Sequence, residues 1–284
     1  MNTDLLLKDA EATLVAVNER FGWQGDEDDQ AWDILTHVLR RQPDPDEDLP
    51  LDVAYRFDEL VKRRATGEPL AFILGWVEFL DFKMAIEPGA FIPRLTSEFL
   101  AKQAIRRLRK RAKPIHIDLA CGIGPVAIGS ARAVPKAKVF GVDISKKAVR
   151  QAQANATKLG AGNATFLKGD MFSPLPEELR GKVDVISIHP PYVPKAEVAD
   201  LPEEIKEYEP AHTLTDASLD GLGLTRRVIS EGREWLGPKG WVLIEIVPTE
   251  SILVRRMFRE HGYLEVRSTH GELKLTRVIC GRMP

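Results

Sequence analysis

The polar side chain with the most distinctive chemical setting in this chain is His189, within the run VDVISIHPPY at residues 183–192. The first six residues of the run are rich in Val and Ile, which is typical of a short buried strand. The strand must end at Pro190 and Pro191, because neither can donate a ladder hydrogen bond. His189 is therefore predicted at the carboxyl end of a central strand, where ligands bind in open α/β sheets. The prolines would hold backbone carbonyls in place there, and Tyr192 would offer a ring for a flat group to stack on.

A second group of residues indicates a nucleotide-like ligand. The run DLACGIGP at 118–125 places glycines at a predicted strand-to-helix turn, where the backbone can approach a ligand closely. Asp143 ends the next predicted strand and can accept both hydroxyls of a ribose, or it can cap the following helix. Asp170 follows the third strand and can meet an adenine amine, with Met171 packed on the ring. These positions predict a cofactor site at the same edge of the sheet as His189.

The glycine turn favours S-adenosylmethionine over a dinucleotide. A dinucleotide site needs a third glycine, and Ala127 stands in its place, while Pro125 follows Gly124 directly. The carboxylate of Asp118 would repel a pyrophosphate but would suit the ammonium group of a methionine moiety. Cys121 is interpreted as a small loop residue, since the sequence places no histidine to activate it as a nucleophile.

Composition sets outer bounds on the function. The 284 residues are 44% hydrophobic and 29% charged, with a net charge of −2, which is ordinary for a globular protein and argues against recruitment of nucleic acid or membrane. The two cysteines form neither a metal-spaced cluster nor a disulfide framework. We find no apolar run of membrane-spanning length and no basic segment typical of a signal peptide, so a cytoplasmic location is predicted.

The order of apolar residues predicts three regions: a helical domain at 1–74, a β-hairpin linker at 75–94 and an α/β domain at 95–284. In the first region apolar residues recur at helical spacing, and the acidic run 26–29 suits the start of a second helix. Thr96 or Ser97 is expected to cap a helix that runs to about residue 111. The basic run at 106–111 is interpreted as a solvated helix face, with an RNA-binding role as the alternative.

Strands and helices then alternate, which is the pattern of a parallel sheet. Strands are predicted at 115–119, 138–142, 165–167, 183–188, 241–246, 264–268 and 275–280, and helices at 125–133, 145–158, 222–235 and 249–261. The last two strands are expected to form an antiparallel pair. The long connection 194–219 holds His212 and Glu209, and loops of this length are often functional lids.

Together these segments resemble the protein-(glutamine-N5) methyltransferases that modify peptide release factors (HemK/PrmC-like). The motifs that carry the resemblance are GEPL at 67–70, EF at 78–79, IPRLTSE at 92–98, the Asp118 loop, VDIS at 142–145, GD at 169–170, HPPY at 189–192, YEP at 208–210 and DGL at 220–222. It implies an α/β fold with the Rossmann-like class I methyltransferase sheet, a helical substrate-recognition domain, S-adenosyl-L-methionine as cofactor and a peptide release factor as partner. The oligomeric state is not indicated.

The resemblance also implies roles for individual residues. Its catalytic residues would be His189, Pro190 and Tyr192, and its substrate-binding residues Arg94, Pro190, Pro191 and Tyr192, with no metal. Its cofactor-binding residues would be Asp118, Ala120, Cys121, Gly122, Gly124, Asp143, Ile144, Asp170, Met171 and His189. Arg94 would orient the substrate or form a structural salt bridge.

Three positions depart from the family pattern. Ala120 replaces the first glycine of the cofactor loop, and Leu95 and Thr96 replace a Pro-acid pair. His189 replaces the Asn whose oxygen, with the first Pro carbonyl, accepts the two N–H bonds of the substrate amide. A neutral imidazole has one acceptor and one donor on opposite sides of the ring, so it could accept one of those bonds or act as a general base. Three outcomes stay open: retained glutamine methylation, a changed acceptor (a small molecule or a nucleic-acid base), or a cofactor-binding protein without turnover.

Overall fold

Two compact units make up the chain, as the contacts within the computed structural model divide it. The described residues are 1–21 and 27–284, and side chains are described outside 16–28. The predictions for Asp26 and for the Val17 side chain therefore lie outside the described residues. The first unit holds residues 1–77, 86–89 and 200–209, and the second holds 78–85, 90–199 and 210–284.

The first unit is helical. Its helices are α1 (Thr3–Phe21), α2 (Glu27–Leu39), α3 (Leu51–Ala65), α4 (Leu70–Leu74) and α8 (Glu203–Tyr208). The apolar positions that recur at helical spacing face a shared core, in which Leu14, Leu35 and Phe57 are almost completely buried. The short helix α4 was not predicted. It ends at Gly75, whose left-handed backbone gives a helix terminus that residues with a side chain rarely allow.

A two-stranded sheet follows, formed by β1 (Trp76–Phe79) and β2 (Phe82–Ala85). This confirms the predicted hairpin. Its apolar side chains Phe79 and Met84 are fully buried, while Lys83 is exposed, so the strands alternate between the interior and solvent. The hairpin is fixed by Asn155 of helix α7 (Lys146–Lys158), whose side chain bonds both the N–H and the C=O of Ala85.

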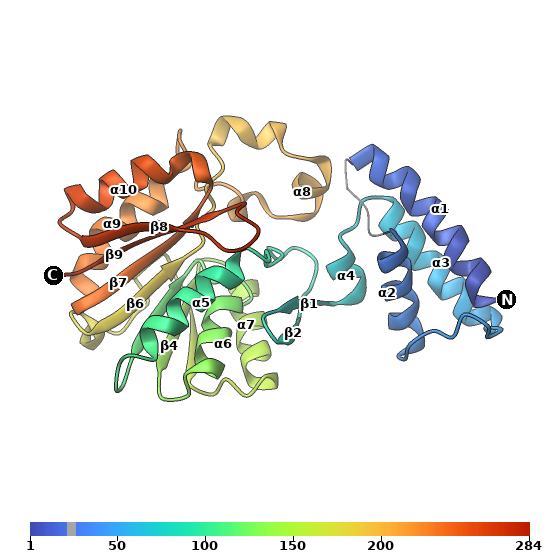
Figure 1. The fold of residues 1–284 in the computed structure, drawn as a ribbon, viewed down its shortest axis with the longest axis horizontal. Helices are drawn as coiled ribbons and strands as arrows, with labels where there is room; N and C mark the ends of the chain where they lie inside the picture. Colours follow the sequence, from blue (N-terminus) through green and yellow to red (C-terminus); the bar gives the residue numbers. More distant parts are fainter. Residues whose placement is uncertain (22–26) are drawn as a thin grey trace. The chain divides into compact units, whose positions relative to one another are not determined.

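A seven-stranded sheet forms the second unit, in the order β5-β4-β3-β6-β7-β9-β8 (Figure 1). Its strands are β3 (Ile115–Leu119), β4 (Lys138–Asp143), β5 (Ala164–Lys168), β6 (Val183–Ile188), β7 (Leu236–Ile246), β8 (Leu264–Thr269) and β9 (Arg277–Arg282). The first five in this order are parallel, and β9 is antiparallel to both β7 and β8. The predicted α/β class and the closing antiparallel pair are thus confirmed.

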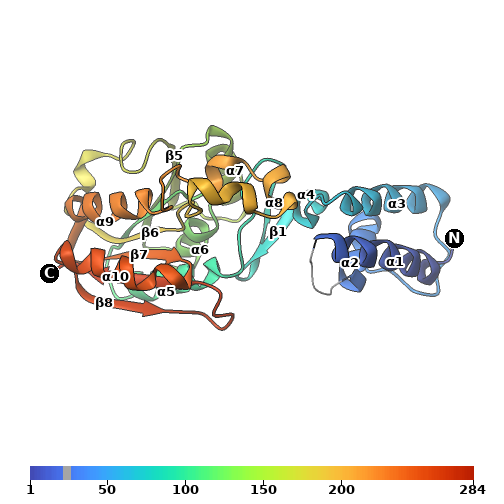
Figure 2. The same ribbon diagram turned by 90° about the horizontal axis from the view of Figure 1, so that it is seen from above.

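Helices cover both faces of this sheet (Figure 1, Figure 2). One face carries α5 (Ser97–Leu108), α6 (Pro125–Ala133) and α7, and the other carries α9 (Gly223–Trp235) and α10 (Ser251–Glu260). Because β6 is covered on both faces, its apolar residues are fully buried, which explains the continuous apolar pattern of its sequence.

The strand order reverses between β3 and β6. From β3 the chain proceeds through β4 to β5 on one side, and from β6 it proceeds to β7 on the other. A crevice at the carboxyl ends of the strands is expected at such a switch point. Asp118 pairs in register with Ser187 across these two strands, so the glycine loop and His189 leave the sheet side by side.

Some boundaries differ from the predicted ones. Strand β7 begins at Leu236 rather than 241, since it passes through Pro238 with a shift in its register to β6. Helix α5 ends at Leu108 and not near 111, and Thr96 makes no side-chain cap. The prediction that Thr96 or Ser97 caps this helix is therefore wrong. Within the connection 194–219 the chain forms α8 and two short 3-10 turns.

Candidate functional site

His189 lies directly after β6, with its ring held from three directions. The Phe91 ring meets it edge-on at 5.6 Å between centroids, and the Tyr192 ring stacks on it, also at 5.6 Å with 26° between planes. Ser97 Oγ is 3.0 Å from Nδ1, and Glu245 Oε2 is 3.7 Å from the same atom. The His189 side chain is 13% exposed, so the ring is ordered by its surroundings yet still reachable.

The peptide after His189 is fixed by the end of the long loop. Tyr192 forms an isolated antiparallel bridge with Thr215, and the N–H of Val193 donates to the carbonyl of Leu214. Gly221 packs against the same peptide with φ +69°, and a Cβ there would lie 2.0 Å from the carbonyl oxygen of Tyr192. Only glycine fits, which accounts for the Asp-Gly-Leu motif as a backbone requirement.

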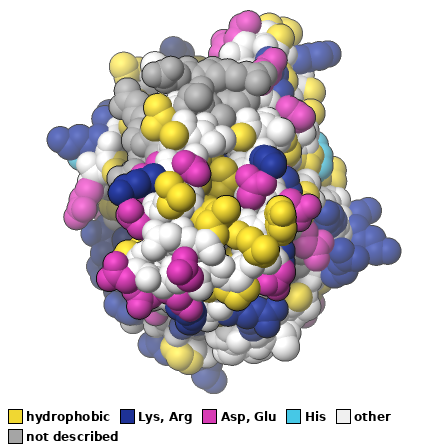
Figure 3. Space-filling model, turned by 90° about the vertical axis from the view of Figure 1, so that its right-hand side faces the viewer, with side chains coloured by type: hydrophobic (Ala, Val, Ile, Leu, Met, Phe, Trp, Pro, Cys, Tyr) yellow, Lys and Arg dark blue, Asp and Glu magenta, His cyan; other side chains and the backbone are white. Residues whose placement is uncertain are grey.

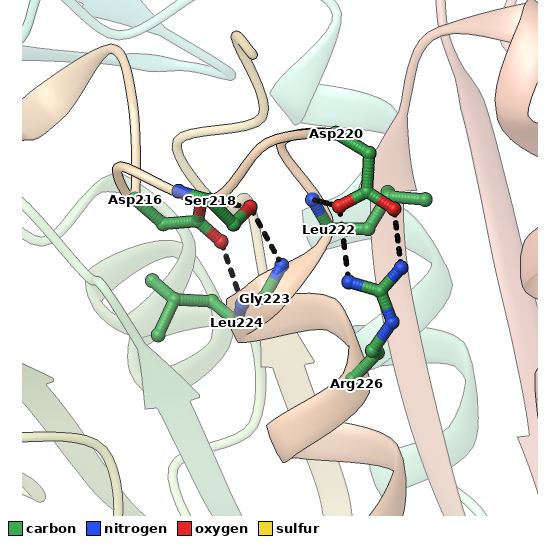
Figure 4. A network of polar contacts seen from close by, with 7 residues as sticks. All are labelled: Asp216, Ser218, Asp220, Leu222, Gly223, Leu224 and Arg226. Atoms are coloured by element: carbon green, nitrogen blue, oxygen red, sulfur yellow. Dashed lines mark hydrogen bonds and ion pairs between the residues drawn. The ribbon is translucent and has the colours of Figure 1, made fainter. Parts of the chain in front are cut away.

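Side chains at the end of this loop bind the backbone N–H groups at the start of α9 (Figure 4). The N–H of Leu224 donates to Asp216 Oδ2 at 2.8 Å, and the N–H of Gly223 donates to Ser218 Oγ at 3.2 Å. Asp220 accepts from the N–H of Leu222 and pairs with Arg226, which lowers the pKa of Asp220 to about 2. These bonds satisfy the free N–H groups of a helix start and anchor residues 216–222 beside Tyr192.

A buried polar chain lies beneath the glycine loop. Ser187 Oγ donates to Asp118 Oδ1 at 2.6 Å and accepts from His116 Nε2 at 2.8 Å. All three side chains are almost completely buried. Burial raises the pKa of Asp118 to about 7 and lowers the pKa of His116 to about 3. His116, which no motif marked, therefore serves as a neutral donor that orients the acid.

The glycine loop follows Asp118 in left-handed backbone. Ala120, Gly122 and Gly124 have φ values of +50°, +55° and +90°. A Cβ on Gly124 would meet Phe166 at 3.0 Å, whereas nothing lies within 4 Å of one on Gly122. Ala120 takes a conformation that costs an L residue about 1–2 kcal/mol, which is the physical reason that glycine suits this position. Cys121 is buried and its pKa is raised well above the usual range by burial, which fits a packing residue.

Asp143 and Ile144 lie across the loop at the end of β4. The two oxygens of Asp143 accept from the N–H groups of Gly122 and Ser145, each at 2.8 Å. The helix cap itself is Ser145, whose Oγ accepts from the N–H of Ala148. Burial is the largest influence on the pKa of Asp143 and raises it, and a nearby His212 lowers it in part. Ile144 is 60% exposed although apolar, so it offers an open face next to the acid.

Asp170 and Met171 are arranged differently from each other. Asp170 accepts from Arg227 Nη1 at 2.9 and 3.0 Å, so this carboxylate is ion-paired to α9. Met171 is buried with a φ of +49°. Its side chain packs in the apolar core, and its predicted contact with an adenine ring stays a prediction.

Arg94 lies over the Phe91 ring, with its guanidinium carbon 4.7 Å from the centroid. Since Phe91 contacts the His189 ring, Arg94 is two contacts away from it. The role of Arg94 in orienting a substrate stays a prediction.

The residues around the loop fit S-adenosylmethionine by their chemistry. A buried acid at the start of the loop suits an ammonium group, and Asp143 keeps lone pairs for ribose hydroxyls beyond its two backbone bonds. The exposed Ile144 suits one face of an adenine. The described residues contain no group of three potential ligands that could hold a metal ion.

The basic run 106–111 contributes to the lining of a groove of about 680 Å³ on the sheet unit. The lining of this groove includes none of the predicted cofactor-binding residues. Arg107 stacks on Trp241 at 4.3 Å, and Arg111 pairs with Asp184 at 3.2 Å. Both arginines thus have structural partners, which supports the interpretation as a helix face more than the RNA-binding one.

Sequence reasoning missed Ser97, Glu245 and Phe91 as neighbours of His189. Ser97 resembled a helix cap, and Glu245 lies within an apolar strand with no motif around it. A signal did exist for Glu245, because an acid in the middle of a buried strand needs a reason.

Comparisons with known proteins agree with this geometry. Residues 6–75 match the PrmC N-terminal domain family, and residues 111–265 match a methyltransferase domain family. A release factor glutamine methyltransferase of Geobacter sulfurreducens is 35% identical over 79% of this chain and 76% of its own. One of Aliivibrio fischeri is 31% identical over 88% of each. The chain belongs to the release factor glutamine methyltransferase family.

Family membership confirms the class I methyltransferase fold and S-adenosylmethionine as the cofactor. Two solved structures share the fold: a methyltransferase from Pyrococcus furiosus (TM-score 0.51, 17% identity, 70% of this chain and 87% of that one) and a 16S rRNA N2 G1207 methyltransferase of T. thermophilus (TM-score 0.52, 19% identity, 74% and 50%). No helix in the described part of the chain has the length and apolar character to cross a membrane.

One relative of this chain is named for a substrate other than a release factor. A 4-amino-L-phenylalanine/4-methylamino-L-phenylalanine methyltransferase of Streptomyces pristinaespiralis is 34% identical over 81% of this chain and 78% of its own. That similarity is as high as the similarity to several members named for release factors.

Proposed function

We propose that this protein transfers a methyl group from S-adenosylmethionine to the side-chain amide nitrogen of a glutamine in a peptide release factor. The observation that carries the proposal is the match of both parts of the chain to this family, the helical part to the PrmC N-terminal domain and the sheet to a methyltransferase domain. A polar-Pro-Pro-Tyr peptide at the end of β6 supports it, because its carbonyls can accept amide N–H bonds.

Within this proposal His189 takes the place of the family's Asn. Pro190 supplies its carbonyl as one acceptor, a His189 ring nitrogen supplies the other, and Tyr192 forms a wall. Holding the nitrogen in line with the methyl carbon supplies most of the catalysis, since an amide is a poor nucleophile until its N–H groups are bound. Asp118, Ala120, Cys121, Gly122, Gly124, Asp143, Ile144 and Asp170 would surround the cofactor.

The helical unit would recognise the protein substrate. Leu5 and Val15 on α1 and Leu51 and Tyr55 on α3 are exposed although apolar. Figure 3 shows hydrophobic side chains exposed between acidic and basic ones on the face that it views. Mixed surfaces of this kind suit contacts with protein more than with a polyanion. A cytoplasmic location stays a prediction.

A small aromatic amine is the second candidate acceptor. The rings of Phe91 and Tyr192 enclose His189 and would suit a flat aromatic substrate, and one relative is named for such an amine.

The first experiment is a transfer assay with labelled S-adenosylmethionine, purified release factors and, in parallel, 4-amino-L-phenylalanine. We expect label on one release-factor glutamine, located by peptide mass spectrometry, and none on a release factor in which that glutamine is replaced by alanine. Label on the arylamine with none on release factors would replace the first candidate with the second. Label on neither would contradict both.

A matched variant, His189→Asn, separates loss of activity from a changed acceptor. If wild type is inactive on release factors and the variant is active, the scaffold has kept its substrate path; label on the arylamine by wild type then distinguishes a changed acceptor from loss of activity. Label in the nucleic-acid fraction of a cell extract, with a steep salt dependence, would instead support a base methyltransferase.

A further inference from the structure

Glu245 places a carboxyl group inside an apolar strand, where a hydrophobic side chain would be expected. It lies in β7, paired in register with Val278, and is fully buried. Neither of its oxygens has a hydrogen-bond partner among the described residues. A buried carboxyl without partners is costly unless a nearby group compensates it. His189 can be such a group, because its Nδ1 is 3.7 Å from Glu245 Oε2.

The same nitrogen faces Ser97. The distance from Ser97 Oγ to His189 Nδ1 is 3.0 Å, a hydrogen-bond distance, whereas 3.7 Å to Glu245 is too long for a direct bond. The Glu245 oxygen, as an acceptor, favours hydrogen on the nitrogen that faces it, and the Ser97 oxygen can accept the hydrogen bond from that N–H. The arrangement therefore selects the tautomer with hydrogen on Nδ1 and leaves the lone pair on Nε2.

The ring cannot easily turn to exchange these two nitrogens. Tyr192 stacks on one face and Phe91 meets the ring at a right angle. The Nδ1 edge points at a fully buried acid, and we infer that the exposed 13% of the side chain includes the Nε2 edge. The free lone pair of Nε2 thus faces the side from which an acceptor would approach.

We propose that Glu245 and Ser97 are positioning residues that make His189 the proton acceptor of methyl transfer, a role that rests on the proposed N-methylation. In this step the acceptor nitrogen bonds to the methyl carbon, the carbon–sulfur bond breaks with its electron pair going to sulfur, and an N–H proton of the acceptor moves to His189 Nε2. The resulting imidazolium is stabilised by Glu245, in the way that a buried acid orients a catalytic histidine.

This role differs from that of an amide in the same position. An Asn oxygen accepts a hydrogen bond but does not take up a proton at neutral pH, whereas a neutral imidazole does both. The substrate class is therefore a nitrogen that carries a proton to be lost, either a primary amide or a primary or secondary aromatic amine. A tertiary amine, which has no N–H to give up, is excluded.

The tautomer can be measured without any turnover. We would record ring ¹⁵N spectra of the full chain with labelled histidine and assign His189 through His189→Asn. Two references lie in the same molecule. His261 Nδ1 lies 2.9 Å from the Met257 carbonyl and must carry hydrogen there, while His116 donates through Nε2 to Ser187. We expect neutral His189 to resemble His261, and to move toward the His116 pattern in Glu245→Gln.

Kinetics give the second readout. Glu245→Gln keeps the side-chain shape and should lower kcat about 100-fold, the low end for loss of general base catalysis, with unchanged affinity for S-adenosylmethionine. In the His189→Asn background the same change should have almost no further effect on kcat, because no imidazole is left to orient. Ser97→Ala should give a smaller loss that likewise disappears in that background.

The outcomes separate the possible failures. A His189 spectrum with hydrogen on Nε2, or equal losses from Glu245→Gln in both backgrounds, would overturn the positioning role. Methylation of neither a release factor nor an arylamine would overturn the proposed function, while the spectrum would still report the tautomer.

Discussion

At the residue scale, Asp118 keeps a carboxyl group in an apolar interior at the start of the cofactor loop. Burial raises its pKa to about 7, and the hydrogen bond from Ser187 offsets only part of that effect. A raised pKa of an acid means that the folded protein holds the proton more tightly than the unfolded chain. Asp118 therefore stabilises the cofactor-free fold at low pH, and this contribution is lost as pH rises from about 4 to about 7.

Cofactor affinity should depend on pH in the opposite sense. If Asp118 binds the ammonium group, only its carboxylate form does so, and affinity for S-adenosylhomocysteine should rise about tenfold between pH 6 and pH 8. Calorimetric titration across this range would measure it. Asp118→Asn should bind more weakly and with a flat profile. His116 should add no pH dependence to the cofactor affinity, because its pKa of about 3 lies below this pH range. A slope that persists in Asp118→Asn would assign the effect to Asp143, whose pKa burial also raises.

These residue roles differ in how far the sequence could predict them. Asp118 and Asp143 were found because acids at the ends of two successive strands follow from the strand pattern alone. Ser97 could not be paired with His189, since 92 residues separate them and a Ser before a helix already has an explanation as a cap. The turn at Met171 was also out of reach, because its left-handed backbone buries a side chain that the sequence places on a loop.

At the element scale, the position of the His189 peptide depends on the turn before α9. Gly221 and Tyr192 are in contact through backbone alone, so no rotamer change can make room for a side chain. The strand β6 and helix α9 are thereby held at a fixed separation at the site. The sequence predicted both elements. It could not predict the distance between them, because that distance depends on contacts between segments far apart in the chain.

Gly221→Ala should therefore displace the HPPY peptide. A Cβ 2.0 Å from the Tyr192 oxygen forces the turn apart, and we expect kcat to fall at least tenfold and stability by about 2–4 kcal/mol. The matched control is Gly160→Ala, where φ is +70° but nothing lies within 4 Å of the new Cβ. That change should cost only about 1 kcal/mol of backbone strain and leave kcat intact. Denaturant unfolding and methyl-transfer rates would measure both, and equal effects would disprove the steric argument.

Elements that the sequence missed share a physical cause. Helix α4 has five residues, too few to show a helical period. Strand β7 continues through Pro238, which the pattern treats as a break, because the strand shifts its register to β6 there. Helix α6, bounded by the glycine loop, and strand β6, which ends at two prolines, agree with their predicted bounds.

At the scale of the whole molecule, the loop after the HPPY peptide belongs to both units. Residues 200–209, including α8, group with the helical unit, while the flanking 190–199 and 210–219 group with the sheet unit. Within the helical unit, Glu204 lies 3.6 Å from Arg64, and Tyr208 Oη lies 3.5 Å from Thr66 Oγ1. A segment tied to the proposed substrate-recognition helices is thus continuous with the peptide that holds the methyl acceptor.

Arg64 is the residue through which this connection can be tested. It is 6% exposed and bonds Gln30 at 2.7 Å and the carbonyl of Glu68 at 3.0 Å, and burial lowers its pKa to about 10, so it stays charged at neutral pH. Arg64→Met keeps most of the volume but removes the cation that faces Glu204. We expect a loss of about 1–3 kcal/mol in the helical unit and faster amide exchange in α8.

The functional consequence should be confined to the protein substrate. In Arg64→Met, KM for a release factor should rise severalfold while affinity for S-adenosylhomocysteine stays unchanged, because the cofactor residues all lie in the sheet unit. The control is the neighbouring Arg63→Met, which removes the same charge from the surface, where the Arg63 side chain is 47% exposed and pairs with Glu68. Exchange mass spectrometry and steady-state kinetics would distinguish the two. If both variants leave KM and α8 exchange at the wild-type values, the Arg64 contact does not couple α8 to substrate recognition.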